Sequence, residues 1–444
     1  MILNKLKAPR IYYTLITCCA FILPMMAQDE ALSPRSTLVV LNPAHPHGAQ
    51  MQQGLKSSLQ KDVYVYAPPN NDVEAAYLNL IERYNESDIR GSGWQVHTHI
   101  GSDYLERMLR DKKGDVALIA SNNQMKARYI QQATAAGFAV IADKPMALTS
   151  SDFDMLKSAF SEAEKHNRFV SDLPVMTMRN QVIYRLQKEL SAVSEIFGTL
   201  EKGSPENPAV VQGNLHYYYK RIKRPTWFFD VKQQGNGVTD VMTHLADLLL
   251  WTCFPEQIVQ YDKDIEIVSA KLWPTMITQE QFEKVTQVEA YPDFLKPYQK
   301  GHQLEVFSNG EIISKIKGVY IRLTAEWDFE PPAGKSDTYY SLLRGTRASL
   351  HIKPGQPTDL YIEPESGVNP TELKKVLYDH VNRLKKDYPF ISLHQERNSW
   401  RISSHQRVLK KTPHVIVPTQ QEVDRMLTKY YIITQADAVA QMSH

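Results

Sequence analysis

The sequence predicts an α/β protein with an N-terminal doubly wound parallel sheet, followed by an α+β domain with an open, mostly antiparallel sheet. From residue 36 to about residue 170, short apolar runs alternate with helical segments, which is typical of βαβ units. Beyond residue 171, several alternating runs follow one another without intervening helices, which favours antiparallel strands. A chain of 444 residues is long enough for two such cores.

Four apolar runs, expected to be buried strands, predict the first domain over residues 36–170. These strands are Ser36–Leu41, Val63–Ala67, Asp115–Ala120 and Phe138–Ala142. The segments between and after them have helical periodicity. The expected helices are Gly48–Leu59, Tyr104–Arg110, Met125–Ala136 and Ser151–Asn167, the last with Ser150 or Ser151 as its N-cap.

The second domain, residues 171–444, is predicted to carry the open sheet and a C-terminal extension. A long helix over Met178–Phe197 and a shorter one over Val238–Trp251 flank the strand V-V-Q-G-N-L-H-Y-Y-Y. Turns such as Ser308-Asn309-Gly310 separate the later strands. Those strands are Ile265–Lys271, Gln303–Phe307, Gly318–Glu326, Ala348–Ile352 and Leu360–Ile362. Helices over 371–387 and from Gln420 complete the domain.

Residues 1–27 have the pattern of a secretory signal peptide. A basic start precedes an apolar stretch that ends in Met25-Met26-Ala27. The stretch is shorter than a bilayer span and contains Pro24, so cleavage is favoured over a membrane anchor. We therefore expect an exported protein, periplasmic or extracellular, in which Cys253 is the one remaining cysteine.

The charge balance argues against a dedicated nucleic-acid binder. Removal of Lys5, Lys7 and Arg10 with the signal leaves 48 basic and 49 acidic residues, a net charge of −1. No later segment is apolar enough for a stable membrane span. The aromatic and basic stretch from Tyr217 to Trp227 could stack on bases, but the neutral charge and the export signal favour a loop beside a sugar pocket.

The first strand runs into the turn Asn42-Pro43-Ala44-His45-Pro46-His47-Gly48. A dinucleotide-binding, Rossmann-like domain usually carries G-x-G-x-x-G at this place. The three glycine positions hold Asn42, Ala44 and His47 here, with Gly48 one residue late. The motif is therefore a poor match, although the helix N-terminus could still hold a phosphate, helped by the histidines. The second strand lacks the usual acidic residue, for which Asp72 is the nearest candidate.

Asp143-Lys144-Pro145 directly follows the apolar run F-A-V-I-A. The carboxyl end of a core strand lies at the ligand-binding edge of an α/β sheet. A partly buried lysine there is suited to proton transfer or to holding a substrate hydroxyl. A solvated lysine at the end of a strand is the simpler alternative.

The segment from Gly235 to Asp247 combines an apolar helical pattern with a narrow polar stripe. Asp240, His244 and Asp247 lie at i, i+4 and i+7, and so are expected on one face of a helix. A carboxylate one turn from a histidine can orient its ring for general acid–base chemistry. A buried, satisfied histidine with only a structural role is the equal alternative.

Together, D-K-P and the later G-x-G-x-x-D-x-x-x-H-x-x-D resemble the glucose–fructose oxidoreductase/inositol dehydrogenase/MocA family. The resemblance also runs through A-A-G-F-A-V-I-A-D-K-P-M-A-L, R-P-T-W-F-F-D and Arg344-Gly345-Thr346-Arg347, so that it covers most of residues 36–350. It implies a Rossmann domain that binds NAD or NADP and a second domain that covers a sugar or polyol. The sequence departs from the family pattern at three places: the altered glycine turn, Asp143 in place of glutamate, and Asn236, which interrupts the later glycine run.

By this resemblance, His244 exchanges the proton of a substrate hydroxyl while Lys144 and Asp240 orient the reacting carbon. The resemblance also implies a cis peptide bond at Lys144-Pro145 and a possible homo-oligomer. Candidate cofactor contacts are Pro43, Ala44, His45, His47, Ser121, Asn122, Asn123, Asp143 and Lys144. Candidate contacts to a carbohydrate substrate are Tyr218, Arg224, Trp227 and Asp247.

Two other classes of function stay open at this stage. One is a glycosidase or lyase that oxidises a sugar transiently with bound NAD, and the other is a sugar-binding relative without cofactor. Export favours a tightly bound cofactor, because free NAD(P) is not maintained outside the cytoplasm. Two pairs of histidines, His45/His47 and His97/His99, each have one residue between them. Further ligands for zinc are not evident, so no metal is predicted.

Overall fold

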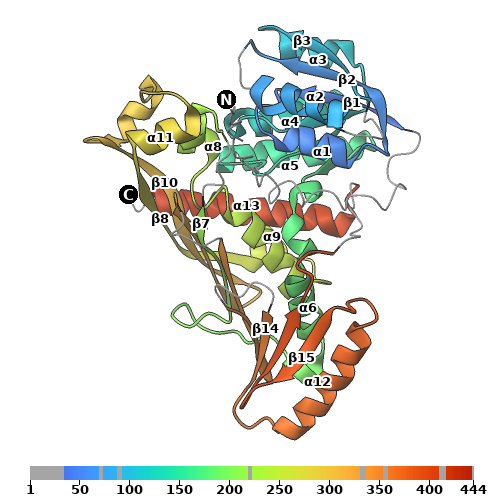
Figure 1. Ribbon diagram of the computed structural model, residues 1–444, viewed down its shortest axis with the longest axis vertical. Helices are drawn as coiled ribbons and strands as arrows, with labels where there is room; N and C mark the ends of the chain where they lie inside the picture. Colours follow the sequence, from blue (N-terminus) through green and yellow to red (C-terminus); the bar gives the residue numbers. More distant parts are fainter. Residues whose placement is uncertain are drawn as a thin grey trace, which may run out of the picture.

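The computed structural model describes residues 35–69, 74–87, 93–218, 223–330, 337–353, 359–409 and 417–442. The predicted signal peptide, Asp72 and the side chain of Tyr218 lie outside this part of the chain. The protein has an N-terminal sheet domain and a longer second domain that descends from it (Figure 1).

The first sheet has six parallel strands in the order β3-β2-β1-β4-β5-β6. Its central strands are fully buried Val, Leu, Ile and Ala runs, as expected for a sheet covered by helices on both faces. The strand order reverses between β1 and β4, which creates the crevice where doubly wound folds bind ligands. The strands are β1 Ser36–Leu41, β2 Leu59–Ala67, β3 Gln95–Ile100, β4 Val116–Ile119, β5 Ala139–Ala142 and β6 Val170–Ser171.

The helices of the first domain confirm the predicted alternation. Helix α5 is capped by Thr149 rather than by Ser150 or Ser151, because Thr149 and Asp152 form a reciprocal capping box. The helices are α1 His47–Gly54, α2 Asn79–Ser87, α3 Tyr104–Asp111, α4 Lys126–Ala135 and α5 Ser150–Lys165.

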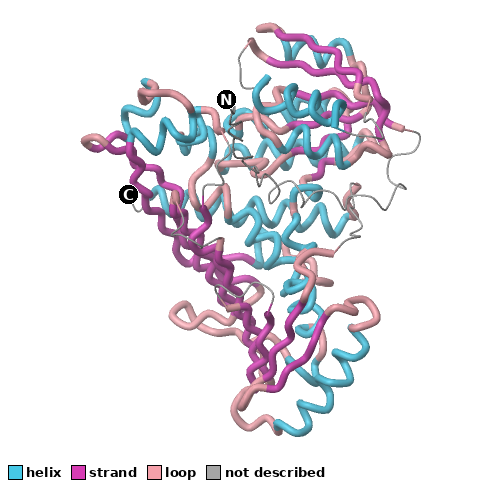
Figure 2. The backbone as a smooth tube through the Cα atoms, viewed as in Figure 1, coloured by secondary structure: helices cyan, strands magenta, loops and turns pink. Residues whose placement is uncertain are grey.

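The second sheet has ten strands in the order β15-β16-β14-β13-β12-β7-β11-β10-β8, with β9 beside β10. Only β7 and β11 pair in parallel, so the predicted mostly antiparallel sheet is confirmed. Figure 2 shows it as a long, twisted layer. Its strands are β7 Val210–Tyr218, β8 Ile265–Thr278, β9 Gln299–Lys300, β10 Gln303–Ile316, β11 Val319–Asp328, β12 Thr338–Arg344, β13 Ala348–Ile352, β14 Asp359–Pro364, β15 Ile391–Gln395 and β16 Trp400–Ser404.

The helices of the second domain lie mainly on one side of this sheet (Figure 1). Helix α13 packs against α9, α5 and β8, and therefore joins the two domains. In the described part of the chain, none of the helices has the length and apolar character needed to span a membrane. The helices are α6 Val182–Ser191, α7 Ser194–Phe197, α8 Val231–Gln234, α9 Met242–Cys253, α10 Tyr261–Asp264, α11 Gln279–Thr286, α12 Pro370–Leu384 and α13 Gln420–Met442.

Two sequence predictions in this domain are wrong. The expected helix Met178–Phe197 is interrupted at Gln181 and Val193, which have extended backbones. Gln181 instead pairs with Val408 in a β-bridge, a tertiary contact that overrides helix propensity. The expected turn at Ser308–Gly310 lies inside β10, at a register shift against β8.

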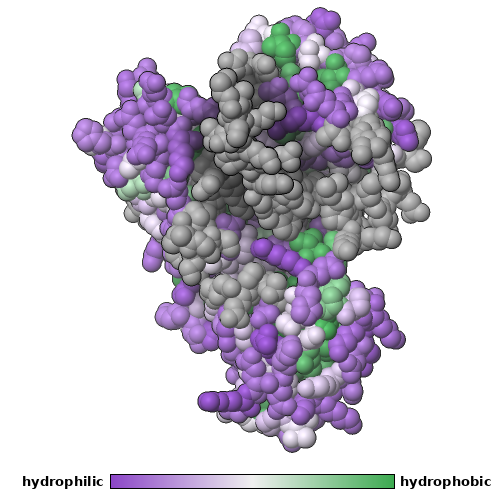
Figure 3. Space-filling model, in the orientation of Figure 1, coloured by the Kyte–Doolittle hydropathy of each residue, from purple (hydrophilic) through white to green (hydrophobic). Residues whose placement is uncertain are grey.

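The face of the molecule in Figure 3 is predominantly hydrophilic where its atoms are coloured. The apolar side chains are concentrated instead in buried clusters, the largest of which runs from the first sheet through α5, α9 and α13 to the second sheet. The two domains thus share one continuous core. This packing explains how the domains keep a fixed relation at the crevice between them.

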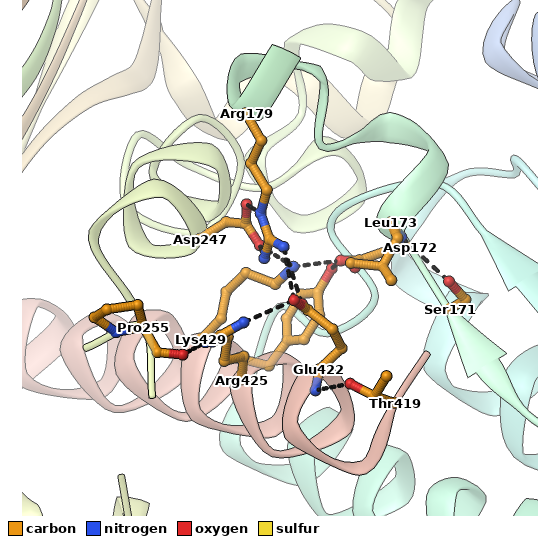
Figure 4. Close-up of polar contacts among 11 residues, drawn as sticks. Ser171, Asp172, Leu173, Arg179, Asp247, Pro255, Thr419, Glu422, Arg425 and Lys429 are labelled. Carbon is orange, nitrogen blue, oxygen red and sulfur yellow. Dashed lines mark hydrogen bonds and ion pairs between the residues drawn. The ribbon is translucent and has the colours of Figure 1, made fainter. Parts of the chain in front are cut away.

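A buried ion network reinforces that shared core (Figure 4). Lys429 of α13 is fully buried and lies 2.7 Å from Asp172, which follows β6, and 3.5 Å from Asp247 of α9. Arg179 binds Asp247 with two hydrogen bonds of 2.7 Å. Glu422 of α13 accepts from Arg179 at 3.0 Å, and from Arg425 as well. Three cations therefore balance three carboxylates where α13 meets both domains.

Replacement of Lys429 by Met should destabilise the protein by about 3–5 kcal/mol, the usual effect of removing one partner from a buried ion pair. Asp172 would keep a buried charge with only the Tyr430 hydroxyl, 2.5 Å away, as its described partner. The second change Asp172→Asn should therefore restore part of the loss. Urea unfolding of the two variants measures this. A double variant no more stable than Lys429→Met would show that burial of the unpaired charge is not the cause.

Candidate active site

The candidate site lies where the carboxyl ends of β1, β4 and β5 face the turn that precedes α9. The βα turn after β1 keeps the geometry of a dinucleotide site with different residues. Asn42 has φ 44°, a left-handed conformation that asparagine tolerates better than most residues, and so it can replace the first glycine. A Cβ on Gly48 would lie 3.4 Å from the Cβ atoms of Ala120 and Pro43. These are ordinary van der Waals distances, so Gly48 packs beside Ala120 and Pro43 without a close approach that only glycine could make.

His45, His47 and Asp143 form a compact cluster beside this turn. The Nδ1 atoms of His45 and His47 lie 3.2 Å and 2.9 Å from the two oxygens of Asp143. The imidazoles keep the pKa of Asp143 well below its usual value, against the effect of burial. Burial lowers the pKa of His45 well below its usual value. Arg224, from the second domain, lies 2.9 Å from Nε2 of His45, so the cluster joins the two domains.

The same three residues have the spacing of a possible metal site, with ligand atoms within 4.8 Å of one another. Asp143 is the third ligand that the histidine spacing alone did not indicate. Nδ1 of His45 accepts a hydrogen bond from the backbone N–H of His47 at 3.3 Å, and Nε2 of the same ring lies 2.9 Å from Arg224. Nδ1 of His47 lies within hydrogen-bond distance of Asp143.

Lys144 and Asp240 meet across the domain boundary. Nζ of Lys144 lies 2.5 Å from Oδ1 of Asp240, and their side chains are 13% and 15% exposed. Lys144 directly follows β5, and its bond to Pro145 is cis. Two residues 96 positions apart are thus brought into one partly buried ion pair.

The turn 235–241 positions Asp240 through close backbone approaches. A Cβ on Gly237 would lie 2.3 Å from the backbone carbon of Asn309, so only glycine fits against the register shift in β10. Oδ1 of Asn236 accepts from the amides of Val238 and Thr239 at 3.0 and 3.1 Å. The amide of Asn236 also donates to Asp437 of α13 at 2.5 Å. Asn236 therefore organises the turn and does not merely interrupt a glycine run.

The predicted polar stripe on one helix is wrong, because α9 begins only at Met242. Asp240 lies in the preceding turn and faces Lys144. Asp247 is 4% exposed, and Arg179 occupies both of its carboxylate oxygens. Its contacts support a structural role and not the substrate contact that the sequence suggested.

His244, in the first turn of α9, lies between these two carboxylates. Its Nδ1 is buried and has no hydrogen-bond partner among the described residues. Burial lowers the pKa of His244 to about 3; nearby Lys144 lowers it further, whereas Asp240 and Asp247 oppose the change. The ring is therefore neutral near pH 7, with one buried nitrogen that has no partner among the described residues.

The remaining predicted residues divide between the two sides of the crevice. Trp227 is only 8% exposed, so its contact with a substrate stays a prediction, as does that of Tyr218. The guanidinium of Arg224 lies 5.0 Å from the ring of Phe228. The amide of Asn122 donates to Gln233 at 2.7 Å, and Ser121 is buried and donates to the Asn122 carbonyl.

Sequence reasoning missed Lys126 and Gln234. Lys126 is fully buried at the start of α4, and burial lowers its pKa to about 8. A lysine in the first turn after a ligand-edge strand is the one signal that could have found it, since basic residues are less favourable at a helix N-terminus. Gln234 contacts Asp240 at 3.0 Å, a contact that depends on how the turn folds.

Family models match both parts of the chain. Residues 42–171 match "Oxidoreductase family, NAD-binding Rossmann fold", the Gfo/Idh/MocA model. Residues 186–441, more than half of the chain, match "Putative oxidoreductase C terminal domain". The chain belongs to the Gfo/Idh/MocA family of oxidoreductases. The family resemblance read from D-K-P and the Asp240–His244 segment is thereby confirmed.

Solved structures agree with this assignment. "A putative oxidoreductase from Parabacteroides merdae ATCC 43184" is 35% identical, with a TM-score of 0.85 over 92% of this chain and 98% of that chain. A second, from Erwinia carotovora atroseptica SCRI1043, is 13% identical with a TM-score of 0.55 over 91% and 98%. GenD2 from gentamicin A biosynthesis, in complex with NAD, is 15% identical with a TM-score of 0.51 over 94% and 97%. The two more distant structures show the fold alone. No curated protein matches the chain.

The residues at the crevice fit the nicotinamide dinucleotide of this NAD-binding family. The left-handed Asn42 reproduces the function of the first glycine. Oδ1 of Asn42 is buried and unpartnered among the described residues, so it can accept a hydrogen bond from a ligand. Arg224 lies beside the middle glycine position through its contact with His45, and its guanidinium is a donor that suits a pyrophosphate.

The stability of the protein should fall as the pH drops below about 6.5, because His244 must remain neutral in the folded state. Its folded pKa of about 3 lies below the unfolded value of 6.5, so the unfolded state binds the proton first. One such group lowers the free energy of unfolding by up to about 2 kcal/mol between pH 7 and pH 5. Urea unfolding at both pH values should show a smaller loss for His244→Asn. Equal losses in wild type and variant would contradict the lowered pKa.

Proposed function

We propose that this oxidoreductase acts on a hydroxyl group of a sugar, polyol or glycoside, with hydride transfer to bound NAD or NADP. The observation that carries the proposal is the 2.5 Å contact between Lys144 and Asp240 across the domain boundary, beside a neutral histidine with an unpartnered buried nitrogen. An ammonium and a proton acceptor close together suit alcohol oxidation, in which a hydroxyl loses its proton as its carbon loses hydride. Family membership supports the same chemistry.

The chain's own groups have distinct roles in this proposal. His244 accepts the proton of the substrate hydroxyl. Lys144 donates a hydrogen bond to the same oxygen and stabilises the negative charge that develops there, and Asp240 holds Lys144 in place. The bound nicotinamide supplies the hydride acceptor. The Rossmann crevice positions it, and the sheet of the second domain covers the substrate.

A second candidate is a lyase or glycosidase that oxidises the sugar transiently and then reduces it again. The predicted signal peptide favours this alternative over net dehydrogenation, because an exported enzyme has no pool of free dinucleotide. Export itself, to the periplasm or the cell exterior, is part of this proposal. Stoichiometric NADH formation separates the two, since the transient reaction leaves none.

Replacement of His244 by Ala should lower kcat by about 10²–10⁴-fold, the range typical of a proton-transfer group. Dinucleotide affinity should hardly change, because His244 belongs to the second domain. The matched control is His97→Ala, since His97 lies on β3 with a half-exposed side chain paired to Asp62. Steady-state kinetics and dinucleotide titration of both variants measure this. A wild-type turnover rate in His244→Ala would remove His244 from the mechanism.

The protein without residues 1–27 should be purified with its dinucleotide bound. The expected result is that heat denaturation, without added cofactor, releases close to one NAD or NADP per chain, measurable by enzymatic cycling. His45→Ala combined with Arg224→Ala should lower that occupancy, because both residues replace part of the glycine turn. No released dinucleotide, and no binding at millimolar NAD and NADP, would leave the cofactor-free sugar-binding alternative.

A further inference from the structure

Lys126 is a fully buried lysine whose described hydrogen bonding is incomplete. Its Nζ donates to Oδ1 of Asn123 at 2.5 Å, whereas an ammonium carries three donor hydrogens. The charged groups that act on it come from several elements: Asp143 and Lys144 after β5, Asp240 before α9, and Asp172 after β6. Lys126 therefore lies within electrostatic range of the Lys144–Asp240 pair, and none of the roles assigned so far includes it.

Asn123 carries this contact across the domain boundary. Its carbonyl oxygen accepts from Lys126, and its Nδ2 donates to the backbone oxygen of Gln234 at 2.6 Å. The lysine is a donor only, so it fixes which end of the amide faces the second domain. Loss of the lysine would leave the orientation of Asn123 undetermined.

Gln234, the last residue of α8, completes the chain of hydrogen bonds. Its Nε2 donates to Oδ2 of Asp240 at 3.0 Å, while Oδ1 of the same carboxylate faces Lys144 at 2.5 Å. One donor thus holds each oxygen of Asp240. Without Gln234 the carboxylate could rotate away from the geometry in which it orients Lys144.

We propose that Lys126, Asn123 and Gln234 are positioning residues that hold the Asp240 carboxylate against Lys144 when the two domains are in contact. This inference rests on the proposed function of the Lys144–Asp240 pair. An ammonium is costly to bury unless it is paired and hydrogen-bonded, and the described hydrogen bond of Lys126 goes to Asn123. None of the three residues needs to touch the substrate.

The neighbouring glutamines of α8 provide a matched test. Gln233 also contacts the first domain, through Asn122 at 2.7 Å, but its amide donates to Asp230 at 2.9 Å. Gln234→Leu should therefore lower kcat about 10- to 100-fold, as loss of a hydrogen bond to a charged group does, with KM within about threefold. Gln233→Leu should leave kcat within about twofold of wild type. Lys126→Met should behave like Gln234→Leu.

Gln234→Glu gives a readout that a merely structural role would not produce. The introduced carboxylate would repel Asp240 at pH 8, whereas its protonated form can donate to Asp240 as the amide does. Its kcat relative to wild type should therefore recover as the pH is lowered from 8 to 5. Gln233→Glu should show a ratio independent of pH. A Gln234→Leu indistinguishable from Gln233→Leu, together with no recovery of Gln234→Glu, would overturn the proposal.

Acylation of Lys144 keeps this test separate from the proposed function, because it needs no substrate. The rate of acetic anhydride labelling, followed by mass spectrometry of peptides, should rise several-fold in Gln234→Leu and in Lys126→Met, since Lys144 loses its fixed partner. Gln233→Leu should match the wild type. Unchanged labelling in all variants would contradict the positioning role even if the enzyme proves active. A wild type that oxidises no sugar, with labelling as expected, would overturn only the proposed function.

Discussion

The ion pair between Lys144 and Asp240 is the contact on which the site depends. Its partners come from different domains, so its 2.5 Å separation exists only while those domains keep one relative position. Charges this far from solvent attract each other strongly but lose hydration, and the pair is favourable only with good geometry. The buried network around Lys429 and the core shared through α13 supply that geometry. The geometry of the active site therefore depends on how the two domains pack against each other.

The turn after β1 shows how a dinucleotide site can survive the loss of its glycines. Asn42 keeps the left-handed backbone conformation of the first glycine. The middle position has changed most, since Ala44 adds a methyl group and His45, His47, Asp143 and Arg224 gather beside it. Under the proposed function, side chains of both domains would contact the phosphate in place of bare backbone, and cofactor binding would then depend on the relative position of the domains.

The sequence predicted the parts of the fold that depend on local pattern. Buried strands such as Ser36–Leu41 and Ala139–Ala142 show in their apolar runs, and D-K-P marked the ligand edge of the sheet. It failed where tertiary contacts decide. Ser308–Gly310 has turn composition, yet Asn309 lies within β10, where its side chain bonds to Trp273, Thr275 and the amide of Trp327. Helical spacing relates Asp240, His244 and Asp247, but the turn organised by Asn236 places Asp240 before the helix. The two carboxylates therefore have different partners, Lys144 for Asp240 and Arg179 for Asp247. Lys126 and Gln234 were missed because the hydrogen bond that links their surroundings, from Asn123 to the backbone oxygen of Gln234, crosses the domain boundary.

Isotope transfer tests directly whether Lys144, Asp240 and His244 act in alcohol oxidation. The purified protein would be incubated with sugars deuterated at their carbinol carbons, and its dinucleotide would then be analysed by mass spectrometry. We expect the nicotinamide to gain one deuterium from a reactive sugar. In net oxidation the label stays on the nicotinamide, whereas in transient oxidation it is present only in samples quenched before the deuteride returns to the product. His244→Ala should slow this gain. A protein that binds both dinucleotide and sugar, yet transfers no deuterium from any of its ligands, would contradict the assignment of Lys144, Asp240 and His244 to alcohol oxidation.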